Sequence, residues 1–366
     1  MGKQSALLCV KRRKGRDLKT ENSVIKKATL GEKIEERSTN INLVRFLAAI
    51  GVLVSHAHIL ADGSEDLLYR LTGVTWGSLA VCFFFFVSGL YLTKSLTVKK
   101  LSGRKYIFSR IRRIIPPLAV VILASVFFLG PCMSTLGSGA YFGNINTWKY
   151  LLNICLIPVH NLPGVFERGN LLSTVNGSLW TLPVEFLCYV FLYVLYKMKF
   201  LKKEKNIIFG AGLLISCVVF YWIGCKVSSS VILSAAQAVV LFFMGGWYYL
   251  NKEKMIFDIR FGLAAAIGWF LFSWIKLSFW GNILFLPVII VTFLIGTKQI
   301  LHQGSKIGNL SYAMYLTAFP VQQTVISLNG GAMSPYLNIV FSIPIVLILA
   351  YVVCWVEKKM IRLVNW

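Results

Sequence analysis

Two ionisable side chains, Arg45 and His56, lie within one strongly apolar stretch of the chain. A separation of 11 residues is close to three turns of an α-helix, so both would lie on one helix face, roughly 16 Å apart along the axis. A guanidinium binds anions, and an imidazole can exchange a proton near neutral pH. The alternative is a structural pair, with the arginine reaching the membrane surface and the histidine hydrogen-bonded in a core. His58 is turned about 200° away and is expected to be interfacial and non-catalytic.

Glu185 is a third ionisable residue in an apolar stretch, within the segment SLWTLPVEFLCYV. Pro183 precedes it, and because proline is well tolerated in a first helical turn, a helix is expected to begin nearby. A carboxylate among aromatic and aliphatic neighbours needs a cation or a hydrogen-bond donor. His56, at a similar depth, is the expected partner. A capping or otherwise structural carboxylate is the alternative.

A basic segment, RKYIFSRIRRIIPPL over residues 104–118, comes directly before another apolar stretch and contains Arg110, Arg112 and Arg113. Arginines at a helix entrance can bind the phosphates of a cytoplasmic cosubstrate through paired hydrogen bonds. The usual excess of basic residues on the cytoplasmic side of a membrane would also explain much of this cluster.

The elements that must carry these residues are membrane helices. The chain has 366 residues, of which 57% are hydrophobic and only 14% charged, whereas a soluble domain has about 25% charged residues. Apolar runs of roughly 20 residues are long enough to cross a bilayer. The sequence therefore predicts an all-α integral membrane protein, a polytopic bundle of about ten transmembrane helices. The expected spans are 41–60, 76–93, 114–131, 180–196, 206–225, 231–250, 261–275, 281–297, 307–327 and 336–356.

The basic residues predict on which side of the membrane each connection lies. If the N-terminal segment and every second connection are cytoplasmic, those segments hold 32 of the 38 Lys and Arg residues. Because cytoplasmic loops carry the excess of basic residues, both termini are expected in the cytoplasm. The same placement explains the net charge of +24, so no nucleic-acid partner is expected.

The chain divides into an arm and a membrane domain. Residues 1–39 are expected to be a basic cytoplasmic arm that is disordered and lies on anionic lipid. Residues 40–366 form the membrane-embedded domain. The outer segment 132–179 is long, and its apolar part, Trp148–Val159, predicts an interfacial or re-entrant helix. The eight cysteines show no CxxC pair and no metal spacing with histidine, so they are expected to be buried hydrophobes, and no metal site is expected.

Five segments of the chain, in this order, resemble the acyltransferase-3 family of integral membrane acyltransferases. They are NLVRFLAAIGVLVSHAH, FFFFVSGLYL, SRIRRIIPPL, GSLWTLPVEFLCYV and IGNLSYAMYLTAFP. The first and fourth are specific, and the order and spacing of all five strengthen the match. The resemblance implies transfer of an acyl group, expected to be acetyl, from cytoplasmic acetyl-CoA to a hydroxyl of an extracytoplasmic or lipid-linked polysaccharide. It also implies a location in the cytoplasmic (inner) membrane.

The resemblance implies roles for particular residues. Arg45 and His56 match the family's functional pair, and Glu185 matches the carboxylate of a Trp-x-x-x-x-Glu-like segment. The catalytic residues are then His56 and Glu185, and the residues that bind acyl-CoA are Arg45, Arg110, Arg112 and Arg113.

Three positions depart from the family's pattern and indicate a divergent substrate. Ser109 stands where many members have an arginine, Cys82 where many have an acidic residue, and Ala318 where many have histidine. None of the three is expected to be catalytic.

Acyl transfer from a thioester to an alcohol needs a base for the hydroxyl proton and a group that stabilises the developing oxyanion. His56 is the expected base. Direct transfer in a ternary complex is the expected route, and an acyl-His56 intermediate is the second route, since no GxSxG nucleophile motif is present.

A secondary transporter or flippase of a lipid-linked glycan is the competing function, because it would also have many spans and buried charge. In this chain the ionisable residues cluster in the first half, and the spans after residue 206 contain almost none. A receptor or structural membrane protein would leave the Arg45 and His56 pair unexplained. The pattern therefore favours the enzyme.

Overall fold

The structure is a computed structural model that describes residues 29–35, 40–227, 230–256, 258–295 and 307–363. Within these ranges the chain is helical, and β-structure is limited to two isolated bridges, Thr29 with Ile256 and Ser134 with Val165. The all-α fold predicted from the sequence is therefore observed in the described residues.

The first half of the chain contains both long and short helices. They are α2 (Leu30–Glu35), α3 (Ile41–Ala61), α4 (Leu67–Thr72), α5 (Trp76–Lys99), α6 (Gly103–Ala124), the π-helical turn η1 (Ser125–Leu129), α7 (Gly130–Met133), α8 (Ser138–Gly143), α9 (Ile145–Lys149), and the 3-10 helices η2 (Tyr150–Cys155) and η3 (Gly177–Trp180).

The second half is more regular. Its helices are α10 (Thr181–Lys197), the 3-10 turn η4 (Lys203–Lys205), α11 (Asn206–Val227), α12 (Ser230–Leu250), α13 (Ile259–Trp274), α14 (Ser278–Leu284), α15 (Leu286–Ile295), α16 (Ile307–Leu328) and α17 (Pro335–Leu363).

Seven helices of the described part are long and apolar enough to cross a membrane by length and composition. They are Ile41–Ala61, Trp76–Lys99, Gly103–Met133, Gly177–Lys197, Lys203–Val227, Val231–Leu250 and Pro335–Arg362. The other three expected spans fall on α13, on α14 with α15, and on α16, which are not among these seven. The described residues are thus consistent with a multi-pass helical protein, while the count of ten and the side of the termini stay predictions.

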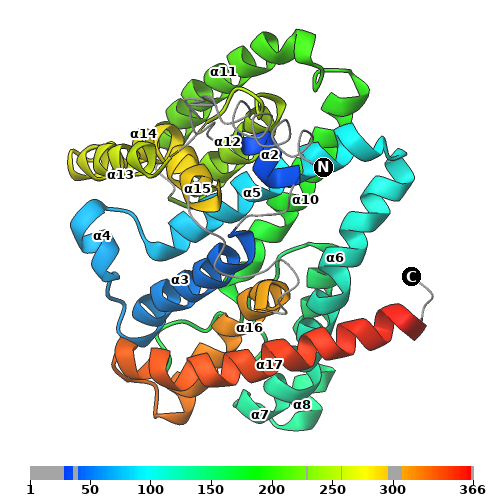
Figure 1. The fold of residues 1–366 in the computed structure, drawn as a ribbon. Coiled ribbons are helices and arrows are strands. Elements are labelled where there is room, and N and C mark those ends of the chain that lie inside the picture. Colours follow the sequence, from blue (N-terminus) through cyan, green and yellow to red (C-terminus); the bar gives the residue numbers. More distant parts are fainter. Residues whose placement is uncertain (1–28, 36–39, 228–229, 257, 296–306, 364–366) are drawn as a thin grey trace, which may run out of the picture.

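The helix α5 lies at the centre of the bundle, packed along α12 on one side and α3 on the other, and α16 packs on α3 and α17. In Figure 1, α17 extends along one side of the bundle, and α13, α14 and α15 lie together away from it. The backbones of α5 and α12 approach closely. A Cβ atom at Gly89 would overlap the carbonyl oxygen of Phe242, and one at Gly245 would overlap that of Phe86. Only glycine allows this approach.

Residues 30–35, within the arm that the sequence predicts as disordered, form the ordered helix α2, which corrects that prediction for this part. Leu30 and Ile34 are one turn apart and buried, so this turn has an apolar face that can pack. Its backbone binds neighbouring elements, because Leu30 N–H donates to the Met255 carbonyl (2.9 Å) and the Lys94 ammonium donates to the Ile34 carbonyl (3.1 Å). Residues 1–28 and 36–39 lie outside the described residues.

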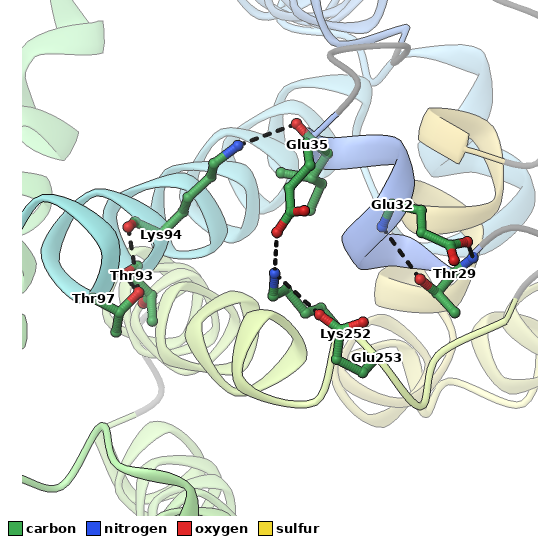
Figure 2. Close-up of polar contacts among 9 residues, drawn as sticks. Thr29, Glu32, Glu35, Thr93, Lys94, Thr97, Lys252 and Glu253 are labelled. Carbon is green, nitrogen blue, oxygen red and sulfur yellow. Dashed lines mark hydrogen bonds and ion pairs between the residues drawn. The ribbon is translucent and has the colours of Figure 1, made fainter.

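An ion pair also ties α2 to the segment after α12. The Lys252 Nζ lies 2.6 Å from a carboxylate oxygen of Glu35 and 3.1 Å from one of Glu253, as Figure 2 shows. Helix α2 is thus joined to α5 through Lys94 and to the segment after α12 through Lys252.

The interfacial or re-entrant helix predicted over Trp148–Val159 is observed only in its first part, as far as Cys155. Helix α9 ends at Lys149, a 3-10 helix follows, and Leu156 has left-handed backbone angles (φ 61°) that end it. The Asn153 side chain donates to the Val159 carbonyl and accepts from the Val159 N–H, at 2.8 and 3.0 Å. Such side-chain bonds to the backbone compete with regular helix.

No disulfide bond joins any of the seven described cysteines. Cys82, Cys188, Cys217 and Cys354 are buried as expected, whereas Cys132, Cys155 and Cys225 are exposed on the protein surface. The prediction of burial therefore holds for four of these seven residues.

Candidate active site

The larger of two neighbouring cavities lies among α3, α5, α6, α10 and α16 and has a volume of about 310 Å³. The charged residues that line it are Arg45, Arg110, Arg113 and Glu185. Three guanidinium groups against one carboxylate make the cavity positive, which favours an anionic ligand. We call it the arginine cavity.

Helix α6 presents only part of its basic cluster to the arginine cavity. Arg110 and Arg113 are one turn apart and therefore share a face, whereas Arg112 is turned about 200° from Arg110 and is not among the lining residues. Ser109 holds Arg110 in place, since its Oγ accepts from the Arg110 Nε (3.2 Å) and donates to the Tyr106 carbonyl (2.6 Å). The structure thus brings three of the four predicted donor-binding arginines together.

The carboxylate of Glu185 binds two hydroxyl groups inside the arginine cavity. Ser88 Oγ on α5 donates to Glu185 Oε1 at 3.3 Å, and the hydroxyl of Tyr189, one turn further along α10, donates to the same oxygen. Arg45 and Arg113 donate no hydrogen bond to any described residue. Their N–H groups are therefore available to a ligand.

His56 lines a second, smaller cavity of about 140 Å³, which we call the histidine cavity. Half of its fourteen lining residues carry hydroxyl or amide groups, namely Ser55, Thr75, Ser78, Ser178, Ser234, Gln237 and Tyr315. The Nδ1 of His56 and the Oγ of Ser178 are buried and have no hydrogen-bond partner among the described residues. Because buried polar atoms in folded proteins are nearly always paired, these two atoms mark a place where a polar molecule could bind.

The structure does not bring His56 into contact with Glu185. The two residues line different cavities, and no hydrogen bond joins them in the described chain. The imidazole is instead positioned by packing against the ring of Phe319. The two rings make a T-shaped contact, with their centroids 5.1 Å apart. The expected direct pairing is therefore absent from this structure.

The two cavities adjoin and are stacked along the helix axes. The arginine cavity touches the beginning of α3 and the later part of α5, and the histidine cavity touches the end of α3 and the beginning of α5. Val81 and Tyr315 line both. The Tyr315 hydroxyl bonds the Ser178 carbonyl and the Thr181 hydroxyl, each at 2.6 Å, which fixes the ring between the cavities.

Sequence reasoning places Tyr189 near Glu185 but missed the hydrogen bond between them, and it missed Val81 and Tyr315. Tyr189 lies four residues after Glu185, a helical spacing that could have indicated the contact. Nothing in the sequence marks Val81, because its importance comes from its position between the two cavities. Tyr315 lies within IGNLSYAMYLTAFP, one of the segments that carry the family resemblance.

Other sequence expectations meet the structure nearby. His58 lines neither cavity. It is buried in the protein, and its Nδ1 lies 3.0 Å from the Ser64 hydroxyl. Cys82 lines the histidine cavity and donates its thiol to the Gln237 amide oxygen at 3.6 Å. The described residues contain no group of three or more His, Cys, Asp or Glu that could hold a metal ion.

The sequence is similar to known proteins over most of its length. Residues 38–356 match a family model described as an acyltransferase domain. The O-acetyl transferase of Shigella phage Sf6 is 28% identical over 355 residues, which is 88% of this chain and 96% of that protein. No solved structure matches. Because the family model extends over most of the chain and contains every residue that lines the two cavities, this multi-pass protein belongs to the acyltransferase-3 family and is an acyltransferase.

Proposed function

We propose that this enzyme transfers an acyl group from cytoplasmic acyl-CoA to a hydroxyl of an extracytoplasmic or lipid-linked polysaccharide, and that the acyl group is acetyl. The observation that supports the proposal is the stacking of a positive cavity and a hydroxyl-lined histidine cavity along the same helices. A reaction between a donor and an acceptor on opposite sides of a membrane needs two such adjoining compartments.

The arginine cavity is the proposed donor site. It adjoins the beginning of α3, the end of α5 and the entrance of α6, where the connecting segments are basic and are therefore proposed to be cytoplasmic. The unoccupied N–H groups of Arg45 and Arg113 can bind phosphate oxygens in the paired geometry that a guanidinium provides. Arg112, outside the cavity, would raise the local positive potential without touching the donor.

The histidine cavity is the proposed acceptor site, and His56 is the proposed base. As the acceptor oxygen attacks the thioester carbonyl carbon, His56 takes the hydroxyl proton. A C–O bond forms, the C–S bond breaks, and the proton passes to the leaving thiolate. Ser178 and the other hydroxyl groups around the cavity suit a polar, hydroxyl-rich acceptor such as a sugar.

Glu185 remains part of the proposed catalytic site, with a changed role. Because it lies beside the arginines and binds Ser88 and Tyr189, we propose that it balances their charge and orders the wall of the donor site. An arginine cavity without this carboxylate would hold three like charges in a partly buried place, which is unfavourable.

The proposed location is the cytoplasmic membrane, where acyl-CoA and lipid-linked saccharides are both within reach. Membrane lipids and the glycan acceptor are the proposed partners. The multi-pass character of the chain supports this location.

Mass spectrometry of surface glycans from cells with and without the gene tests the proposal. We expect the glycan to be present in both, and lighter by one kind of acyl group where the gene is missing, so that the mass increment identifies the acyl group. Glycans of identical mass would overturn the proposal. Loss of the whole glycan from the cell surface would instead support a flippase.

A further inference from the structure

The arginine and histidine cavities have two lining residues in common, Val81 on α5 and Tyr315 on α16. We infer that these two side chains form a partition that limits the length of the acyl chain the enzyme transfers. The inference rests on the proposed function, since it assigns the donor to one cavity and the acceptor to the other.

Val81 stands at the point on α5 where the lining changes from one cavity to the other. The α5 residues that line only the histidine cavity are Gly77, Ser78 and Cys82, and those that line only the arginine cavity begin at Phe84. Val81 is partly buried, and its two methyl groups are the apolar part of the boundary. A change in their bulk therefore changes the space at the junction.

Tyr315 completes the partition from the opposite helix. Its side chain is only 8% exposed, and its hydroxyl is held by the Ser178 carbonyl and the Thr181 hydroxyl. The Tyr315 ring also makes a T-shaped contact with the Phe84 ring, with the two ring centroids 6.4 Å apart. With two hydrogen bonds and this ring contact, Tyr315 cannot turn aside without breaking bonds, so Val81 is the adjustable side of the partition.

The chemistry of acyl transfer places the reacting carbon at this boundary. The acceptor oxygen must come within about 3–3.5 Å of the thioester carbonyl carbon, and the two substrates occupy different cavities. The carbonyl must therefore lie at the partition, where the C–O bond forms and the C–S bond breaks. Carbons beyond the carbonyl then need space next to Val81 and Tyr315, and an acetyl group needs the least.

The test uses inside-out membrane vesicles from cells that make the glycan, so that the vesicles supply the acceptor and expose the cytoplasmic face. Radiolabelled acetyl-, propionyl- and butyryl-CoA are the probes, and the label in the carbohydrate fraction is counted. The variants are Val81→Ala, which enlarges the junction, and Val81→Leu, which narrows it. Val121→Ala is the matched control, because Val121 is a buried valine of α6 that lines neither cavity.

One methylene group more or less in an apolar pocket changes an enzyme's preference between two substrates about tenfold or more. We therefore expect wild type to prefer acetyl, Val81→Ala to raise the butyryl-to-acetyl ratio about tenfold, and Val81→Leu to lower the propionyl-to-acetyl ratio. Val121→Ala should keep the wild-type ratios. Because each result is a ratio within one preparation, differences in the amount of inserted protein cancel.

Two results would overturn the inference alone: wild type that transfers butyryl as readily as acetyl, or Val81 variants whose ratios equal those of Val121→Ala. Vesicles of wild type that transfer no label from any of the three donors would overturn the proposed function, and the inference with it. If Val81→Ala does not insert into the membrane, the Val81→Leu ratio decides the question.

Discussion

Ser88 on α5 and Glu185 on α10 are joined by a hydrogen bond of 3.3 Å between their side-chain oxygens. Among the described residues that line the arginine cavity, Glu185 is the only acidic one, and this bond places its carboxylate against α5. The position of the carboxylate is therefore fixed by α5 rather than by the histidine of α3.

Replacement of Glu185 by glutamine should lower acyl transfer by roughly ten- to a hundredfold. Glutamine keeps the shape and can still accept from Ser88 and Tyr189, but hydrogen bonds to a charged group are about twice as strong as neutral ones, and the arginines lose their counter-charge. Initial rates of label transfer from acetyl-CoA in vesicles measure the effect. Glu204→Gln, an exposed residue of η4, is the control and should keep wild-type rates. Equal rates in both variants would show that Glu185 is only structural.

Arg45→Lys should raise the KM for acyl-CoA roughly tenfold, although the charge is kept, because lysine cannot form the paired contacts that a guanidinium makes with phosphate. Arg113→Lys should behave in the same way. Arg112→Lys is the matched control, since Arg112 comes from the same cluster but lies outside the arginine cavity. If the KM for acyl-CoA is the same in all three variants and in wild type, the arginine cavity is not the donor site.

His56→Ala should abolish detectable acylation while the protein still reaches the membrane, because loss of a general base typically costs about 10² to 10⁴ in rate. His58→Ala should remain active, since His58 lines neither cavity and bonds Ser64 instead. Immunoblots of the membrane fraction show whether both variants insert. If His56→Ala is active and His58→Ala is inactive, the catalytic residue of α3 lies on the opposite face of the helix from the one proposed.

The docking of α2 should weaken in acid. The hydrogen bond from Lys252, followed by its charge, lowers the pKa of Glu35 below its usual value of 4.5. A group with a lowered pKa stabilises the folded state above its unfolded pKa, and this contribution is lost as the pH falls through the lowered value. Protection of the Leu30 and Gly31 amides against hydrogen exchange should therefore fall below about pH 4. Glu35→Gln should show weaker protection that does not change between neutral pH and this range. Wild-type protection that is equally independent of pH would contradict this assignment.

A cysteine introduced at Ser138 should react with a membrane-impermeant thiol reagent from outside intact cells, and one at Lys203 only after permeabilisation. Both positions are exposed on the protein, so access depends on the side of the membrane. The measurement requires a background without the native cysteines. The reversed pattern would overturn the cytoplasmic placement of both termini, which rests on the asymmetry of basic residues.

The relation between Arg45 and His56 could be anticipated because both belong to one helix, whose periodicity alone determines which residues share a face. The structure agrees, because both residues line cavities on the side of α3 that faces the neighbouring helices. Pairing between His56 and Glu185 was a different kind of prediction. Similar depth on two helices does not determine how each helix is rotated about its axis, and α10 is rotated so that Glu185 points toward Ser88.

Helix α2 escaped prediction because composition was averaged over residues 1–39. The many basic residues of this segment conceal Leu30 and Ile34, which are enough to bury one helical turn when a partner surface exists. Partner surfaces are a tertiary property that composition does not contain. The same holds for the Asn153 bonds to Val159, where the expected helix of the outer segment ends early.

The glycine contacts between α5 and α12 have a consequence for motion during turnover. Helices whose backbones touch at Gly89 and Gly245 cannot slide or rotate against each other without steric overlap, so this pair moves as one rigid body. Opening of a path for substrates must then come from the elements around this pair and not from a separation of its two helices. We therefore expect the α5 and α12 pair to be the stationary frame of the catalytic cycle.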